Sequence, residues 1–198
     1  MRIACLDLEG VLVPEIWQSV AERSGVDDLN LTTRDIPDYH ELMRRRLAIL
    51  DREGILISDI QAVIAGMEPL PGACEFTARL REQMQLIILS DTFAEFAQPL
   101  MRQLGWPTLL CNALTIDAHG RIRSYHLRQE DGKRHAVRSF QGMNLTVRAA
   151  GDSYNDLGMI LTADAGAFFR PPDSIRAEHP SVPVLTAYDE LLHFLTVQ

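Results

Sequence analysis

Short apolar runs alternate with amphipathic stretches along most of the chain, a pattern typical of a parallel sheet covered by helices. Each of the first four apolar runs is followed at its carboxyl end by polar or glycine-containing residues. Open parallel sheets bind ligands beyond those ends, so the chemistry is expected there. The predicted strands cover residues 3–8, 86–89, 108–111, 146–150, 165–169 and 182–185.

The stretch from 14 to 69 breaks this rhythm, because it has helical spacing and no strand pattern. Trp17, Val20 and Ala21 recur at helical intervals, as do the apolar residues between 42 and 50, and a further helix is predicted over 58–65. We therefore predict an α/β fold with a catalytic core of residues 1–13 and 70–198 and a helical cap of residues 14–69 inserted after the first strand. The stretch 114–127, with turn residues His119 and Gly120, predicts a small accessory β-hairpin.

Composition and charge narrow the classes of function. The chain of 198 residues is 46% hydrophobic and carries a formal charge of −8, and its basic residues form no stripe, which argues against a nucleic-acid partner. The first residues do not resemble a signal peptide, and no apolar run reaches the roughly 18 residues that cross a bilayer. Three widely spaced cysteines give little support to a disulfide or zinc framework, so a cytoplasmic location is expected.

Two acidic residues, Asp7 and Glu9, stand where the first predicted strand ends. Strand alternation would place both side chains on one side and Leu8 on the other. Two close carboxylates repel unless a cation or a proton lies between them, so the pair suggests a metal site. The alternative is that they only end a strand and begin a turn, and this motif alone does not decide between the two.

A second acidic motif, Gly-Asp-Ser-Tyr-Asn-Asp at 151–156, follows an apolar run and precedes a predicted helix. Either acid alone is explained as a helix cap or as a first-turn acid that the helix dipole favours. Mg²⁺ prefers oxygen ligands and commonly takes one or two carboxylates together with a substrate phosphate. Asp152 and Asp7 could supply those carboxylates.

Two further elements could bind phosphate. Ser90-Asp91-Thr92 follows the second apolar run, where a hydroxyl and backbone N–H groups can hold phosphate oxygens, although this motif taken alone favours an N-cap for the next helix. Lys133 and Arg134 begin an amphipathic stretch, and on their own they indicate only a solvated surface.

In this order the four elements resemble the motifs of the haloacid dehalogenase superfamily. Its phosphatases carry Asp-x-Asp, a Ser or Thr, a Lys and Gly-Asp-x-x-Asn-Asp at successive strand ends, and the match spans residues 3–169. The resemblance implies a Rossmann-like core, Mg²⁺ and an aspartyl-phosphate intermediate. Chemistry agrees, because a carboxylate can be the nucleophile when a metal and a Lys neutralise the phosphate.

The resemblance extends to the phosphoserine phosphatases, whose helical cap also follows the first motif. Glu15 lies near the position where those enzymes bind the substrate ammonium, and Arg46 matches the Arg that binds its carboxylate. An ordinary charged cap surface is the alternative for both. Glu9-Gly10 and Ser90-Asp91-Thr92 depart from the usual second Asp and Ser-Gly-Gly, and they resemble the phosphoserine phosphatases that also transfer phosphate to homoserine.

This resemblance implies O-phosphoserine as substrate, homoserine as an optional acceptor and Mg²⁺ as cofactor. Asp7 would attack phosphorus, and Glu9 would protonate the departing serine and then deprotonate the water or homoserine that follows. The remaining implied roles are phosphate binding by Ser90 and Lys133, substrate binding by Glu15, Arg46, Asp91 and Asn155, metal binding by Asp7, the backbone carbonyl of Glu9 and Asp152, and orientation of the metal ligands by Asn155 and Asp156.

Other readings stay open. The chain could act on another small phosphorylated metabolite, or it could be a signalling receiver that stores phosphate on an Asp, although a receiver would need neither the helical insertion nor Glu15 and Arg46. A non-catalytic binding protein is a third class, and the retained Asp7, Ser90 and Lys133 count against it. The sequence decides neither the cellular acceptor nor the oligomeric state, for which a homodimer is one option.

Overall fold

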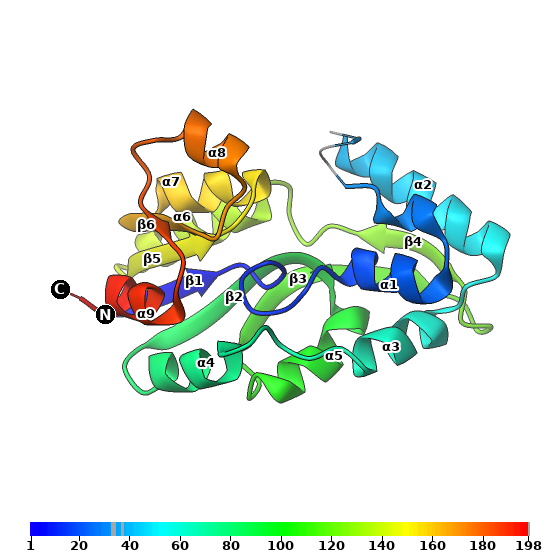
Figure 1. The fold of residues 1–198 in the computed structure, drawn as a ribbon, viewed down its shortest axis with the longest axis horizontal. Coiled ribbons are helices and arrows are strands. Elements are labelled where there is room, and N and C mark those ends of the chain that lie inside the picture. Colours follow the sequence, from blue (N-terminus) through cyan, green and yellow to red (C-terminus); the bar gives the residue numbers. More distant parts are fainter. Residues whose placement is uncertain (33–34, 37, 198) are drawn as a thin grey trace.

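A seven-stranded sheet with helices on both faces forms the frame of the molecule in a computed structural model that describes residues 1–32, 35–36 and 38–197 (Figure 1). The strand order is β4-β3-β2-β1-β5-β6-β7, and neighbouring strands are parallel except for β3 and β4. The predicted α/β fold is confirmed. The strands are β1 (Arg2–Leu6), β2 (Gln85–Phe93), β3 (Thr108–Ile116), β4 (Ile122–His126), β5 (Thr146–Gly151), β6 (Ala165–Phe169) and β7 (Val184–Leu185).

Side-chain alternation in the central strand β1 builds a core on each face of the sheet. Ala4 and Leu6 pack into a cluster with side chains of α4 (Ala73–Arg81), α5 (Ala94–Gln103) and α9 (Tyr188–Thr196). Ile3 and Cys5 belong to a second cluster with side chains of α6 (Gly132–Gly142) and α7 (Leu157–Thr162). A short helix, α8 (Asp173–Glu178), follows β6. Both faces are therefore buried, which explains why the strands read as nearly continuous apolar runs.

The chain between β1 and α4 is helical, as the spacing predicts. It forms α1 (Ile16–Ser24), a short 3₁₀ helix η1 (Asp27–Asn30), α2 (Tyr39–Glu53) and α3 (Ile57–Ala65), and its described residues after 14 hold no strand. Helix α2 begins at the side chain of Asp38, which accepts a hydrogen bond from the Glu41 N–H at 3.0 Å. Helix α3 packs against α1 and α5, whereas α2 contacts β4. The division into a core and a cap of residues 14–69 stays a prediction.

Some elements differ in length from the prediction. β1 ends at Leu6 and not at Leu8, because the chain then turns back and the N–H groups of Leu12 and Val13 both donate to the Leu8 carbonyl. β3 continues to Ile116, so the hairpin predicted over 114–127 is made by the far half of β3 and by β4 and is continuous with the sheet.

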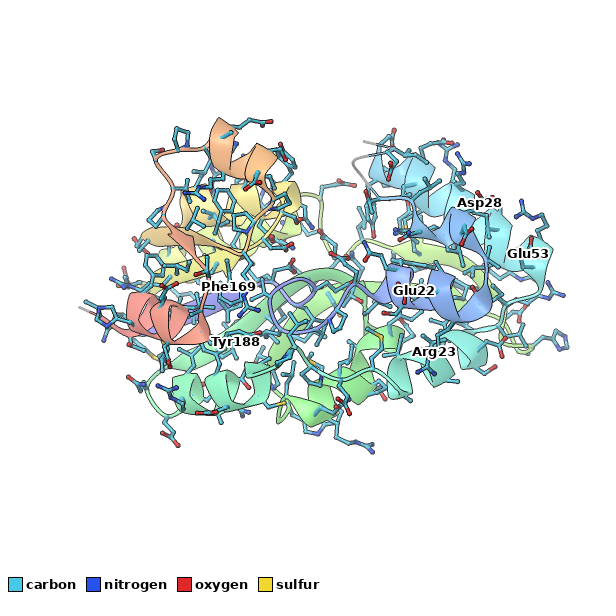
Figure 2. All side chains as sticks on the ribbon, viewed as in Figure 1. Glu22, Arg23, Asp28, Glu53, Phe169 and Tyr188 are labelled. Carbon is cyan, nitrogen blue, oxygen red and sulfur yellow. The ribbon has the colours of Figure 1, made fainter. Side chains whose placement is uncertain are left out.

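Aromatic stacking fixes the last helix and, through it, the loop after β1. Phe169 at the end of β6 stacks on Tyr188 of α9 with ring centroids 5.0 Å apart (Figure 2). The Tyr188 hydroxyl donates to the Val11 carbonyl at 2.7 Å, and the Leu70 N–H donates to the Leu12 carbonyl at 2.9 Å.

Among the described residues no helix combines the length and the apolar character that crossing a bilayer requires.

Candidate active site

Strand topology brings three of the motifs together. β1 lies between β2 and β5, and Leu6 is in register with Ile88 on one side and with Ala150 on the other. Residues just beyond these positions therefore meet at one edge of the sheet. Asp7 follows β1, Ser90 lies near the end of β2 and Asp152 follows β5.

Lys133, the only lysine in the chain, joins the motifs. It lies in the first turn of α6 and is buried, with 5% of its surface exposed. Its Nζ is 2.7 Å from Oδ1 of Asp156, 2.9 Å from Oδ1 of Asp7 and 3.9 Å from Oδ2 of Asp91. Burial lowers the pKa of Lys133, but the charges of these carboxylates outweigh it and hold the pKa well above its usual value.

Carboxylate oxygens of Asp7, Asp152 and Asp156 all lie within 4.8 Å of one another. Asp156 is fully buried, and its Oδ2 accepts hydrogen bonds from the N–H groups of Asp152 at 2.9 Å and Ser153 at 3.1 Å. Gly10 makes room for the cluster, because its φ is +74° and a Cβ there would lie 2.5 Å from Cγ of Asp152. Gly10 therefore leaves the space that the Asp152 side chain occupies, which the sequence did not indicate.

The cluster carries more negative charge than Lys133 balances. Burial raises the pKa of Asp7 well above its usual range; repulsion from Asp156 and Asp152 adds to this rise, and Lys133 opposes it. Burial also raises the pKa of Asp152 to about 7, with a further contribution from Asp156. Oxygen ligands at this spacing with excess negative charge match what a hard divalent cation such as Mg²⁺ requires.

Glu9 reaches from the β1 loop to the first turn of α1. Its Oε2 accepts a hydrogen bond from the Ile16 N–H at 2.9 Å, so the carboxylate is held at a helix N-terminus. Burial raises the pKa of Glu9 to about 7, and the charge of Glu15 raises it further, whereas the hydrogen bond from Ile16 lowers it. Such a pKa suits a group that exchanges protons near neutral pH.

A cavity of about 180 Å³ lies between these groups and the helical segment, the chain between β1 and α4. An open groove of about 850 Å³ adjoins it and shares Tyr39, Asp91 and Asn155, and Lys133 lines this groove. Carboxylate oxygens of Asp152 and Asp156 lie within 4.8 Å of that of Asp7, and all ten predicted site residues therefore gather in one region. Those that line the smaller cavity are Asp7, Glu9, Glu15, Arg46, Ser90, Asp91 and Asn155.

Arg46 also lines this cavity and is buried with 7% exposure. Its Nη2 donates to the Leu31 carbonyl at 2.7 Å, and its guanidinium carbon lies 4.5 Å from the centroid of the Trp17 ring. Among the other lining residues, Nδ2 of Asn155 donates to Oδ2 of Asp91 at 2.8 Å. Asp91 and Asn155 are thus bonded to each other, which the sequence did not indicate.

Sequence reasoning missed three residues of the site. Trp17 appears only as a member of an apolar helical stripe, Tyr39 directs its hydroxyl to the Asp91 carbonyl at 3.4 Å, and Asn112 donates to that carbonyl at 3.0 Å. No local pattern marks Tyr39 or Asn112. Lys133, by contrast, was predicted, and its being the only lysine among 198 residues is a further sequence feature that marks it.

The sequence matches the family model of the haloacid dehalogenase-like hydrolases over residues 1–164. A phosphoserine phosphatase of Pseudomonas syringae pathovar tomato is 56% identical over 191 residues, covering 96% of this chain and 81% of that protein. The phosphoserine phosphatase ThrH of Pseudomonas aeruginosa is also 56% identical over 191 residues, covering 96% of this chain and 93% of that protein.

Solved structures share the fold. A substrate-bound phosphoserine phosphatase complex superimposes with a TM-score of 0.81 at 17% identity, and a phospho-aspartyl intermediate analogue of phosphoserine phosphatase with 0.80 at 16%, each over 98% of both chains. The predicted superfamily and its phosphoserine phosphatase branch are confirmed by the family model and by the two Pseudomonas relatives. The chain belongs to the haloacid dehalogenase-like hydrolases.

Proposed function

We propose that this hydrolase is an Mg²⁺-dependent phosphoserine phosphatase that forms an aspartyl phosphate on Asp7. One observation carries the proposal: a buried Asp7 contacts the only lysine of the chain and lines the same cavity as Arg46 and Glu15. Such a cavity matches a small molecule with a phosphate at one end and an ammonium and a carboxylate at the other. The names of the two Pseudomonas relatives support the same substrate.

Asp7 is oriented for attack by one of its oxygens. Oδ1 accepts hydrogen bonds from the Leu8 N–H at 2.8 Å and from Lys133 at 2.9 Å, which supports Oδ2 as the oxygen that would attack phosphorus. Ser90 and Lys133 would hold the transferring phosphoryl group. When bound by Asp7, Asp152 and the backbone carbonyl of Glu9, Mg²⁺ would neutralise charge on the phosphate oxygens, and Asp156 would hold Asp152 and Lys133 in place.

Glu9 is the proposed acid and base. As the bond between phosphorus and the serine oxygen breaks, Glu9 donates its proton to that oxygen, and it then takes a proton from the water that attacks phospho-Asp7. A pKa near 7 leaves both protonation states accessible at neutral pH. Arg46 and Glu15 would bind the carboxylate and the ammonium of the amino acid, and Asp91 and Asn155 would line its path to the groove.

Transfer of the phosphate to homoserine is the second proposed activity. Its support is the position of Glu9, whose carboxylate is one methylene farther from the backbone than that of the usual Asp and is bonded to the Ile16 N–H. We infer that this tether misaligns the attacking water, so that a bound hydroxyl competes for phospho-Asp7. A misplacement of about 1 Å can cost about a hundredfold in rate, which is enough to alter the partition.

The experiment incubates the enzyme with O-phosphoserine and Mg²⁺, with and without homoserine, and measures serine, free phosphate and phosphohomoserine separately. Asp7→Asn should reduce serine release by a factor on the order of 10⁴ or more, because an amide cannot form the acyl phosphate. Asp189→Asn, which changes an exposed carboxylate on α9, is the matched control and should keep full activity. Substantial turnover by a folded Asp7→Asn protein would contradict the assignment, and absence of serine release by the wild type would favour a receiver or binding protein.

A further inference from the structure

An aromatic column supports the guanidinium of Arg46. Trp17 of α1 lies beneath it, and the Trp17 ring meets Phe96 of α5 edge to face, with centroids 5.6 Å apart and planes at 73°. Phe96 in turn meets Phe93, at the end of β2, with centroids 5.4 Å apart and planes at 86°. Both phenylalanines are only 1% exposed. Arg46 therefore rests on a stack that begins in the core next to the Ser90 motif.

The contacts of Arg46 fix its plane but do not use all its donors. Nη2 donates to the Leu31 carbonyl at 2.7 Å, and among the described residues Nη1 has only the Met43 sulfur at 3.9 Å. Nε is buried and has no hydrogen-bond partner within the described part of the chain. A buried guanidinium with donors to spare needs an acceptor, and a carboxylate is the anion whose two oxygens match its planar fork.

The indole face compensates for water that the guanidinium has lost. Burial lowers the pKa of Arg46 to about 10, against the opposing charges of Tyr39, Glu9 and Glu15. A cation over the face of tryptophan is attracted by the ring, most strongly where water is excluded. An aliphatic residue at position 17 would leave that face without an electrostatic partner and would allow the guanidinium to tilt.

We propose that Trp17 is a positioning residue that holds Arg46 in the plane needed to bind the substrate carboxylate and so sets the preference for a phosphorylated amino acid over phosphates that lack a carboxylate. This inference rests on the proposed function. Trp17 acts through Arg46 and contacts no reacting atom. Its replacement should change selectivity between substrates, whereas a purely structural residue would lower activity on all substrates alike.

The test compares kcat and KM for O-phosphoserine and for p-nitrophenyl phosphate, which has no carboxylate. Trp17→Leu should lower the ratio of the two kcat/KM values about 2- to 30-fold, mainly through the KM for phosphoserine. Trp17→Phe keeps an aromatic face and should restore part of that loss. Trp106→Phe, at the other tryptophan of the chain, 57% exposed, should leave the ratio unchanged.

A double-mutant cycle shows whether Trp17 works through Arg46. In an Arg46→Ala background, Trp17→Leu should change the ratio by less than about twofold, because the group that it positions is gone. Additive losses would overturn the inference, as would equal losses of both substrates in Trp17→Leu or no recovery in Trp17→Phe.

Fluorescence provides a readout that does not depend on a folded Trp17→Leu protein. In the Trp106→Phe protein, Trp17 is the only tryptophan, and L-serine should produce a saturable change in its emission as the serine carboxylate binds Arg46. Inorganic phosphate should not, and Arg46→Ala should abolish the change. The inference would be overturned if the emission of Trp17 did not change at serine concentrations that inhibit the enzyme.

The two proposals fail in different ways. If Arg46→Ala lowers the selectivity ratio and the Trp17 variants do not, only the role of Trp17 is wrong. If Arg46→Ala leaves the ratio unchanged, Arg46 does not bind the carboxylate and the role of Trp17 is refuted, while phosphoserine hydrolysis by the wild type still supports the proposed function. If the wild type releases no serine from phosphoserine, the proposed function is wrong and the role of Trp17 is refuted with it.

Discussion

Replacing Lys133 by methionine tests whether the acidic cluster depends on one cation. Lys133→Met keeps a long apolar stem but removes the ammonium that lies 2.7 Å from Asp156 and 2.9 Å from Asp7. Both carboxylates are buried, with 0% and 5% exposure, so water cannot replace the lost charge. Breaking a buried ion pair by removing one partner costs about 3–5 kcal/mol.

That free energy is large beside the roughly 5–15 kcal/mol by which proteins are stable. For a chain of 198 residues, about 2–4 °C in Tm accompanies each kcal/mol, so Lys133→Met should lower the Tm by roughly 6–20 °C at pH 8 without metal. Mg²⁺ should recover part of the loss and should raise the Tm of the variant more than that of the wild type, because the cation binds only the folded cluster.

The loss should depend on pH with a definite sign. The pKa of Asp152 is raised from 3.8 to about 7 in the folded protein, and that of Asp7 is also raised. A carboxyl with a higher pKa in the folded state destabilises the fold as pH rises from its unfolded to its folded pKa. Protonated carboxyls need no counter-charge, so the penalty of Lys133→Met should be largest above pH 7 and should shrink as the pH falls toward 4.

Thermal unfolding followed by circular dichroism at several pH values measures this directly. Arg138→Met, an exposed cation on the same helix, is the matched control and should change the Tm little. If Lys133→Met were as stable as the wild type at pH 8, or if its penalty grew at low pH, the acidic cluster would not need Lys133 as a counter-charge and the electrostatic account of the site would be wrong.

Two further changes test the loop after β1. Glu9→Asp should raise the ratio of free phosphate to phosphohomoserine at fixed homoserine, measured by phosphorus NMR, and an unchanged ratio would assign acceptor choice to the helical segment. Gly10→Ala should raise the Mg²⁺ concentration for half-maximal activity about 10- to 100-fold, because its Cβ would displace Asp152. Gly25→Ala has a similar φ of +69°, but a Cβ there would meet no described residue within 4 Å, so equal effects of the two alanines would refute this reason.

The residues at the strand ends could be predicted because one rule places them. Parallel strands carry their polar termini to the same edge, so short apolar runs followed by Asp7, Ser90 and Asp152 were sufficient to gather these side chains. The rule needs only the order of elements, and the order β2-β1-β5 satisfies it. The rule does not need the length of each strand. The prediction that β1 extends to Leu8 was therefore wrong without affecting the predicted position of Asp7.

Contacts between separate elements could not be predicted in the same way. Helical spacing indicates that Trp17 is partly buried, but it does not indicate that α1 places the indole under a guanidinium of α2. The hydrogen bond from Tyr39 to the Asp91 carbonyl joins residues 52 positions apart and depends on where α2 begins. Such contacts arise from how helices pack, and hydrophobic periodicity carries no information on that packing.

The charge balance of the site connects the metal to the acidity of the whole chain. When all are ionised, Asp7, Asp152, Asp156 and Lys133 leave two uncompensated negative charges in a buried cluster. A phosphate dianion brought beside Asp7 would be repelled, and the formal charge of the chain, −8, does not offset this repulsion. A divalent cation would neutralise the cluster and leave Lys133 free to attract the phosphate. In the proposed function, substrate affinity should therefore follow metal occupancy, because neutralising the acidic cluster removes the repulsion of the substrate phosphate.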